Sequence, residues 1–257
     1  TGTNNVAMGS GSLDANTTGG SNTAIGENAL THNTTASNNT AVGKGALDAN
    51  TTANNNVAVG GASLGANTTG TRNVAVGAAA LTDSTTATDN TAVGYDCLLR
   101  NTTGDQNTAV GSASLDANTT GIRNHAFGVE ALTDCTTADN NTALGHTALA
   151  NVTTGSNNTG IGYNAGSSLT TGATNVIVGV SCQPSAASGA GQIVMGNTVT
   201  GVGNDNFTFG AGSTDSNIEF GATSITAPSD IRLKEDIQDE EVGLDFINDL
   251  RPVTFQW

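Results

Sequence analysis

A glycine recurs every 17 residues along most of this chain. The intervals hold without an insertion or deletion from Gly9 to Gly196, over twelve glycines. A fixed period of this kind is typical of a solenoid, in which equivalent residues meet in successive coils. A period of 17 is too short for a pair of helices, which takes about 33 residues or more. The period therefore predicts stacked single coils.

The other positions of the repeat favour strands and turns. Asn precedes the glycine by four residues, Leu follows it by four, and a Thr-Thr pair lies eight and nine residues after it. Gly, Asn and Thr are poor helix formers, and the alternation in Val57-Ala-Val59 is that of a strand. The Asn-Thr-Thr-Gly/Ala stretch has the composition of a turn. We expect an all-β fold, a parallel β-roll or β-solenoid of 17-residue coils over residues 1–196.

Regularly spaced apolar residues are expected to form the core of the coils. A lone coil cannot fold, because one Val and one Leu contribute about 1.5–3 kcal/mol each, against ~1–2 kcal/mol of backbone entropy for every residue fixed. The predicted core residues are Ile25, Leu30, Val42, Leu47, Val59, Leu64, Val76, Leu81, Val93, Leu98, Val110 and Leu115. The glycines that repeat beside them are Gly26, Gly43, Gly60, Gly77, Gly94 and Gly111. So thin a core predicts a homotrimer, with small residues on the second strand face allowing another chain to approach closely.

Composition and charge exclude several classes of protein. The net charge is −15 and the sequence pI is about 4.1, so the chain lacks the basic face that nucleic-acid binding requires. No apolar run approaches the ~20 residues of a membrane-spanning helix. Three cysteines at irregular spacing do not indicate a disulfide framework.

No pattern indicates a metal or cofactor site. His32, His125 and His146 are scattered, and His125 takes a slot that is otherwise Thr or Val in most coils. Cys97 and Cys135 also replace repeat residues, and Cys97 is interpreted as a small buried hydrophobe. The turn residues Asp83, Asp89, Asp105, Asp134 and Asp139 favour a solvated face over calcium binding. The Thr-Thr ladder favours turn geometry and stacked hydrogen bonds over an ice-binding face.

The character of the chain changes near its C-terminal end. Residues 197–228 lose the 17-residue register but keep strand signals, and we expect them to form a β-rich neck. After Pro228 the charged residues become dense, and Glu240–Leu250 has the apolar spacing of a short helix. Residues 229–257 are therefore expected to begin a separate domain.

Two resemblances follow from these segments. The units NTAVGKGALDANTTANNN and NVAVGAAALTDSTTATDN resemble the head repeats of trimeric autotransporter adhesins, which implies a parallel β-roll of three side-by-side chains. The stretch Ser229-Asp-Ile-Arg-Leu-Lys-Glu-Asp-Ile and the residues to Trp257 resemble the start of the intramolecular chaperone domain of phage tailspikes and endosialidases. That resemblance implies trimerisation, and cleavage between Pro228 and Ser229 with Lys234 as the base.

The first functional hypothesis is a structural and adhesive one. It describes the shaft of a homotrimeric phage tail fibre or similar appendage, extracellular or on a virion, that reaches a host-cell receptor or glycan through a tip or neck. A bacterial surface adhesin or extracellular filament subunit is the alternative. A self-cleaving processing unit that uses Ser229 and Lys234 is the third hypothesis. We expect no other enzymatic activity and no membrane insertion.

Overall fold

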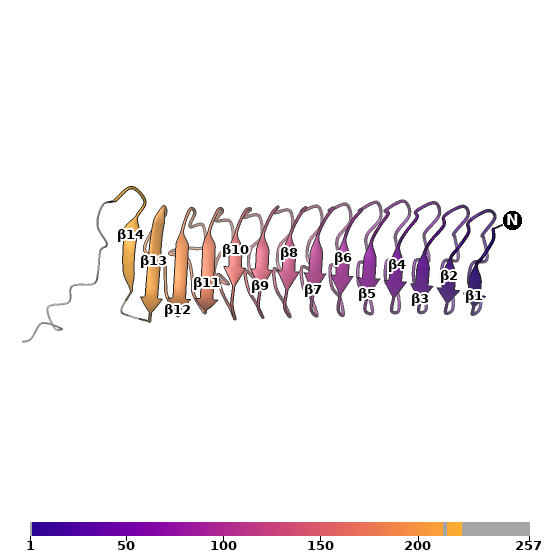
Figure 1. The fold of residues 1–257 in the computed structure, drawn as a ribbon, viewed down its shortest axis with the longest axis horizontal. Coiled ribbons are helices and arrows are strands. Elements are labelled where there is room, and N and C mark those ends of the chain that lie inside the picture. The colour runs from indigo at the N-terminus through magenta and orange to yellow at the C-terminus, as the bar shows by residue number, and fades with distance from the viewer. Residues whose placement is uncertain (1, 213–214, 223–257) are drawn as a thin grey trace, which may run out of the picture. The chain divides into compact units, whose positions relative to one another are not determined.

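The computed structural model describes residues 2–212 and 215–222. Fourteen strands lie side by side in one sheet, in the order in which they occur along the chain (Figure 1). The first thirteen run parallel and the last is antiparallel to its neighbour. The predicted all-β parallel solenoid with 17-residue coils is confirmed. The strands are β1 Val6–Met8, β2 Thr23–Ile25, β3 Thr40–Val42, β4 Val57–Val59, β5 Val74–Val76, β6 Thr91–Val93, β7 Thr108–Val110, β8 His125–Phe127, β9 Thr142–Leu144, β10 Thr159–Ile161, β11 Val176–Val180, β12 Ile193–Asn197, β13 Asn206–Ala211 and β14 Ser216–Glu219.

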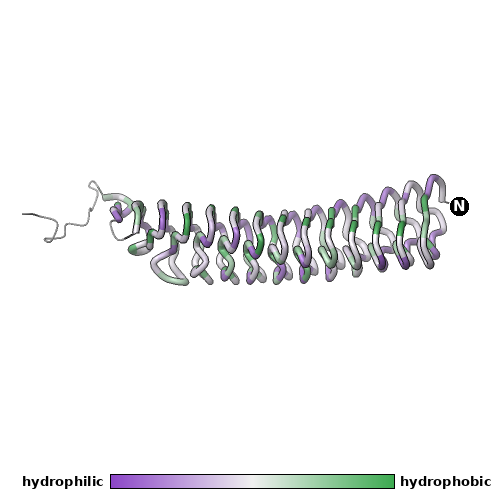
Figure 2. The backbone as a smooth tube through the Cα atoms, turned by 90° about the horizontal axis from the view of Figure 1, so that it is seen from below, coloured by the Kyte–Doolittle hydropathy of each residue, from purple (hydrophilic) through white to green (hydrophobic). Residues whose placement is uncertain are grey.

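Strand pairing follows the repeat in the sequence. In β4 and β5, Val57 pairs with Val74 and Val59 pairs with Val76, so residues 17 apart are neighbours in the sheet. The apolar and polar stretches of the backbone accordingly recur at the same place in successive coils (Figure 2). Equivalent side chains thus lie over one another, which is the condition under which small contributions add up along a solenoid.

The two faces of each strand are reversed relative to the prediction. Ala58, Ala75 and Ala92, in the middle of their strands, are fully buried. The residue before each repeat glycine points outward instead and is half-buried or exposed, with Val76 and Val110 37% and 36% exposed. The assignment of these outward residues to the core of the coil is wrong for Ile25, Val42, Val59, Val76, Val93 and Val110. The interior is narrow, and it is the small alanine of the strand that packs there opposite leucine.

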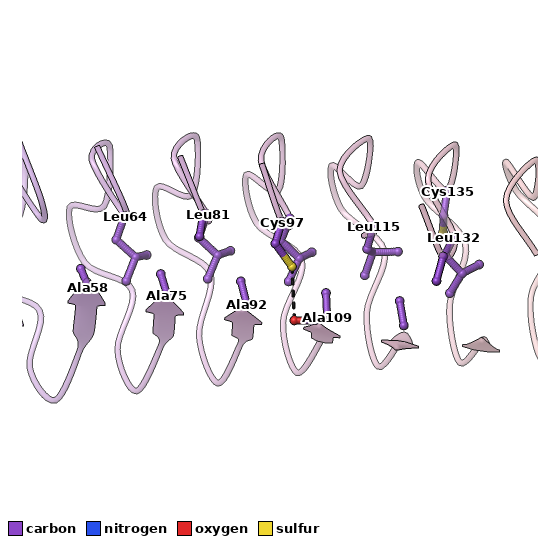
Figure 3. Close-up of a cluster of buried hydrophobic side chains, with 14 of the residues drawn as sticks. Ala58, Leu64, Ala75, Leu81, Ala92, Cys97, Ala109, Leu115, Leu132 and Cys135 are labelled. Atoms are coloured by element: carbon purple, nitrogen blue, oxygen red, sulfur yellow. Dashed lines mark hydrogen bonds between the residues drawn. The ribbon is translucent and has the colours of Figure 1, made fainter. Parts of the chain in front are cut away.

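Leucine supplies most of the apolar volume of the interior. The six leucines named above, from Leu30 to Leu115, are fully buried, and Figure 3 shows several of them pointing toward the alanines of the strands. All nine leucines of the repeat have positive φ, between 49° and 55°. This left-handed conformation costs ~1–2 kcal/mol for an ordinary residue. Burial of the side chain offsets that cost, and the leucine N–H reaches the next coil, as in Leu64 N to Ala80 O at 3.0 Å.

The return half of each coil follows a period of three residues rather than two. From Leu81 to Asn90, every third residue is buried, the next is half-buried and the one after it is exposed. The buried positions are occupied by Leu81, Ser84, Ala87 and Asn90. Two of these four are polar, so the interior of the coil needs internal hydrogen bonds as well as apolar contacts.

A ladder of buried asparagines satisfies the polar groups at the start of each strand. The Asn56 side chain accepts a hydrogen bond from the backbone N–H of Asn73 at 2.9 Å and donates one to Gly70 O at 2.8 Å, both in the next coil. The same two bonds recur from Asn5 through Asn175, where the backbone N–H of Gln192 is the last donor. Each side chain therefore fastens its coil to the following one.

A second asparagine ladder lies on the return half; it is interrupted once and ends at Asn118. Asn50 donates to Asn33 Oδ1 at 3.1 Å and Asn67 donates to Asn50 Oδ1 at 3.0 Å. The Oδ1 atoms of Asn67 and Asn118 lack a hydrogen-bond donor. The reason lies in the sequence, because the next coil holds Ser84 in the first case and Cys135 in the second.

The repeat glycine is required by both its conformation and its surroundings. Gly60 has φ of 139°, a region that residues with a side chain rarely adopt. A Cβ atom at this position would collide with the backbone carbonyl of Gly77 in the next coil. Gly61, one residue later, has open space around it. The strict recurrence of glycine is thus a consequence of close coil-to-coil stacking.

The parallel sheet continues beyond residue 196, where the 17-residue register ends. Gly196 pairs with Gly210, a step of 14 residues, so β13 still stacks in parallel on β12. β14 then pairs antiparallel with β13 through Phe207 and Ile218. The two expected strands of the neck therefore belong to the same sheet as the repeats. Contacts divide the chain into Thr1–Thr226 and Ala227–Trp257, and the expected helix at 240–250 lies outside the described residues.

The interrupted asparagine ladder can be tested by completing it. Ser84→Asn should raise the free energy of unfolding by about 1 kcal/mol, because the new amide would donate to Asn67 Oδ1 in an already buried slot. Urea unfolding followed by far-UV circular dichroism measures the change. Thr86→Asn, on the exposed surface of the same coil, is the control and should change stability little. A lower stability for Ser84→Asn than for the control would contradict the proposed role of the ladder.

Candidate functional site

The outward side chains of the strands form an apolar face along the coils. The residue before the repeat glycine is apolar in all twelve coils. Phe127, Leu144 and Ile161 are 39%, 50% and 38% exposed. Exposed apolar patches that continue over many residues are typical of protein contact sites. We call this column the seam; it consists of Met8, Ile25, Val42, Val59, Val76, Val93, Val110, Phe127, Leu144, Ile161, Val178 and Met195.

Beside the seam lies a second outward column, two residues earlier in each strand. Thr and Val occupy most of its positions, and β12 carries Ile193. His125 is the exception and pairs in register with Thr108 and Thr142. It is exposed on the outer face of β8. Threonine and valine both suit a half-buried pleated surface, so this column has the composition of a partly covered sheet face.

The histidines do not converge on a common site. His32 Nδ1 lies 3.4 Å from Asp48 Oδ1 and 3.0 Å from the Asp48 carbonyl oxygen, on an exposed part of the coil. The His146 ring stacks on Tyr163 with 5.7 Å between ring centroids. Among the described residues, no three His, Cys, Asp or Glu side chains gather closely enough to hold a metal ion.

The cysteines are buried parts of the interior. Cys97 Sγ lies 3.2 Å from the Ala109 carbonyl oxygen (Figure 3), and Cys182 Sγ lies 3.2 Å from Gly196 O. Burial raises the pKa of both Cys97 and Cys135 to about 12. A nucleophilic cysteine needs the opposite shift, toward the thiolate. The geometry and the pKa of Cys97 and Cys135 therefore suit packing and not catalysis.

Several acidic residues bind neighbouring coils. Asp89 receives two hydrogen bonds from Arg72, at 2.6 and 2.8 Å, which lower the pKa of its carboxyl group. Asp105 Oδ1 accepts the Thr88 backbone N–H at 2.6 Å, and Asp139 Oδ1 accepts that of Ile122 at 2.8 Å. These three carboxylates tie one coil to the next.

The remaining acidic positions lie on the surface. Asp83 and Asp134 are exposed. Asp134 lines a shallow polar depression of about 290 Å³ together with Glu130 and Asn151. Ser167 and two threonines also line this depression, but His, Lys and Arg do not, and its lining does not suggest a reaction.

The Thr-Thr pairs stack as a ladder along the coils. Thr34 Oγ1 donates to Thr51 O at 3.1 Å, and Thr51 Oγ1 donates to Thr68 O at 3.3 Å, each one coil further on. The asparagines before these pairs, such as Asn50, are fully buried and hydrogen-bonded. The sequence Asn-Thr-Thr is thus a structural element of the coil in which the asparagine amide is inaccessible to glycosylation.

The candidate catalytic pair Ser229 and Lys234 lies outside the described residues, so the structure does not bear on its geometry. Sequence reasoning identified the apolar column that we call the seam but placed it inside the coil. The signal that could have corrected this is the recurrence of Ala in the middle of the first nine strands, because a narrow interior favours a small apolar side chain. Within the described part of the chain there is no helix long and apolar enough to cross a membrane.

Comparison with known proteins relates the C-terminal segment to a family. Residues 229–257 match the family described as the chaperone of endosialidase. Neither the curated proteins nor the solved structures gave a match to the chain. The resemblance of the repeats to adhesin heads therefore stays a prediction, whereas a chaperone-like segment after a β-solenoid is what the findings support.

Proposed function

We propose that this chain is the shaft of a homotrimeric extracellular fibre, as in a phage tail fibre or a similar appendage. Its role is mechanical: the stacked coils project a binding tip or neck toward a receptor or glycan on a host cell. The apolar seam along the outside of the strands is the observation that carries the proposal. A structural chain with this seam needs partner chains, and three copies can each cover part of the seam of the others.

The C-terminal segment supports assembly into a fibre. Residues 229–257 match a chaperone family and come after the last described strand, β14, in the sequence. Each parallel strand pair joins residues 17 apart, so a coil must close, at a cost in entropy, before its contacts form. A chaperone-like segment at the C-terminal end is consistent with a chain whose repeats need help to pair in register.

A bacterial surface adhesin or filament subunit could use the same coils and the same seam. The two possibilities differ in what attaches the shaft to its base. A membrane-anchor segment in the complete gene favours the adhesin, and a capsid- or tail-attachment domain favours the phage fibre. Sequencing the complete gene decides between these two origins, whereas the shaft itself has the same mechanical role in both.

The trimer can be tested by measuring the solution mass of the 257-residue chain. Sedimentation equilibrium at neutral pH should give one species of three times the 25.4 kDa chain mass. The mass should persist at high salt, because apolar contacts are not screened by ions. A monomer at all concentrations up to the millimolar range would contradict the trimeric shaft.

We also propose that the bond between Pro228 and Ser229 is a processing site. The Ser229 hydroxyl would attack the Pro228 carbonyl carbon as its proton passes to a neutral Lys234. The C–N bond between Pro228 and Ser229 would then break as the Ser229 amine takes up that proton, which leaves Pro228 as an ester on Ser229 Oγ. Water would hydrolyse this ester to a Pro228 carboxylate and a free Ser229 hydroxyl. Expression of the complete gene should yield a shaft that ends at Pro228, and both Ser229→Ala and Lys234→Ala should abolish this product. Intact-mass spectrometry reads the result, and unchanged processing in both variants would remove the role.

A further inference from the structure

The seam is not uniform along the coils. In β3 to β7 each seam residue is valine, whereas β8, β9 and β10 carry Phe127, Leu144 and Ile161. These three side chains are larger than valine and remain 38–50% exposed. Larger exposed side chains contribute more apolar area when a second chain covers them. The seam of β8 to β10 therefore offers more contact area in each coil than the seam of β3 to β7.

The residues directly after the repeat glycines change in the same direction. In the N-terminal coils they include Glu27 and Lys44, whose charged ends form an ion pair at 3.1 Å on the surface. After β8 to β11 they are Val129, His146, Tyr163 and Val180, and Val129, Tyr163 and Val180 are 43%, 56% and 48% exposed. After β3 to β7 only Tyr95 is a large apolar or aromatic residue at this position, and it is 61% exposed. In the coils of β8 to β11 the seam is thus accompanied by exposed apolar or aromatic residues in three of four coils, against one of five in the coils of β3 to β7.

Two features restrict the conformations of the side chains on this apolar surface before any partner binds. The stacked rings of His146 and Tyr163 restrict each other across neighbouring coils. In β11 the strand continues through Gly179 to Val180, so Val176, Val178 and Val180 alternate onto one face. Side chains that are already ordered lose less conformational entropy when they are covered. We define the broad face by Phe127, Val129, Leu144, Ile161, Tyr163 and Val180.

We propose that association of the chains depends on this broad face, and that the valine part of the seam closes onto a partner only after it. The occupant is a second copy of this chain. The seam repeats the same apolar side chain at every coil from β3 to β7 and offers a self-similar surface, which a parallel copy matches along its whole length. The broad face also lies in the C-terminal half of the repeat, and β12, β13 and β14 separate it in sequence from residues 229–257, where the chaperone family matches. The inference rests on the proposed trimeric shaft.

Paired substitutions in the seam test the proposal. Leu144→Lys with Ile161→Lys alters the broad face, and Val42→Lys with Val59→Lys is the matched control in the valine part, with the same number of changes in the same outward column. The broad-face pair should sediment as a monomer at a concentration where the unmodified chain is fully trimeric. The control pair should stay trimeric and show faster amide hydrogen exchange in the N-terminal coils alone. Far-UV circular dichroism verifies that both variants keep their strands.

A milder pair keeps the test valid if lysine prevents folding. Leu144→Thr with Ile161→Thr uses a residue that already occurs on the outer face of these strands, as at Thr108 and Thr142. The dissociation constant should rise at least tenfold more than for Val42→Thr with Val59→Thr. Equal losses in the two regions would overturn the proposal while the trimeric shaft stands. A monomeric unmodified chain would remove the trimeric shaft and this proposal together, so the two failures are distinguishable.

Discussion

The two hydrogen bonds that each buried asparagine makes to the next coil are the interaction on which the rest of the structure depends. A buried amide or backbone group without a partner costs about 1–3 kcal/mol, and the interior of this solenoid is too narrow to bury much apolar surface in return. The asparagine ladder removes that cost at every coil from Asn5 to Asn175. It also requires that the next coil be present and in register. Stability is therefore a property of neighbouring coils together and not of any one of them.

The arrangement of the coils follows from their spacing in the sequence. A period of 17 without interruption predicts that Val59 and Val76 are neighbours, and they are paired in the sheet. The recurring glycine is explained by the close approach of Gly60 to the backbone of Gly77. The register of the strands could be predicted because the interval between the repeat glycines is always 17 residues. A constant interval pairs each strand residue with the residue 17 positions later.

The direction of the side chains could not be predicted in the same way. The rule that apolar residues lie inside assigned Val76 to the core, but the structure buries Ala75 and leaves Val76 37% exposed. Apolar residues on a surface are common, and here they serve a partner chain in our proposal. The left-handed conformation of Leu81 could not be predicted either, because leucine has no preference for positive φ. Burial of its side chain offsets the cost of this backbone conformation, and that burial is known only from the structure. The return half of the coil, with its period of three, gave no strand or helix signal at all.

The central claim is that the coils stack in a fixed 17-residue register, and deletion of coils tests it most directly. Removal of residues 78–94 joins Gly77 to Tyr95 and takes out one full period, whereas removal of 78–95 takes out one residue more and shifts every later position. Thermal unfolding followed by far-UV circular dichroism compares the two chains. The account predicts a cooperative transition close to that of the complete chain for the first deletion and a large loss of strand signal for the second. Equal stability of the two deletions would contradict it.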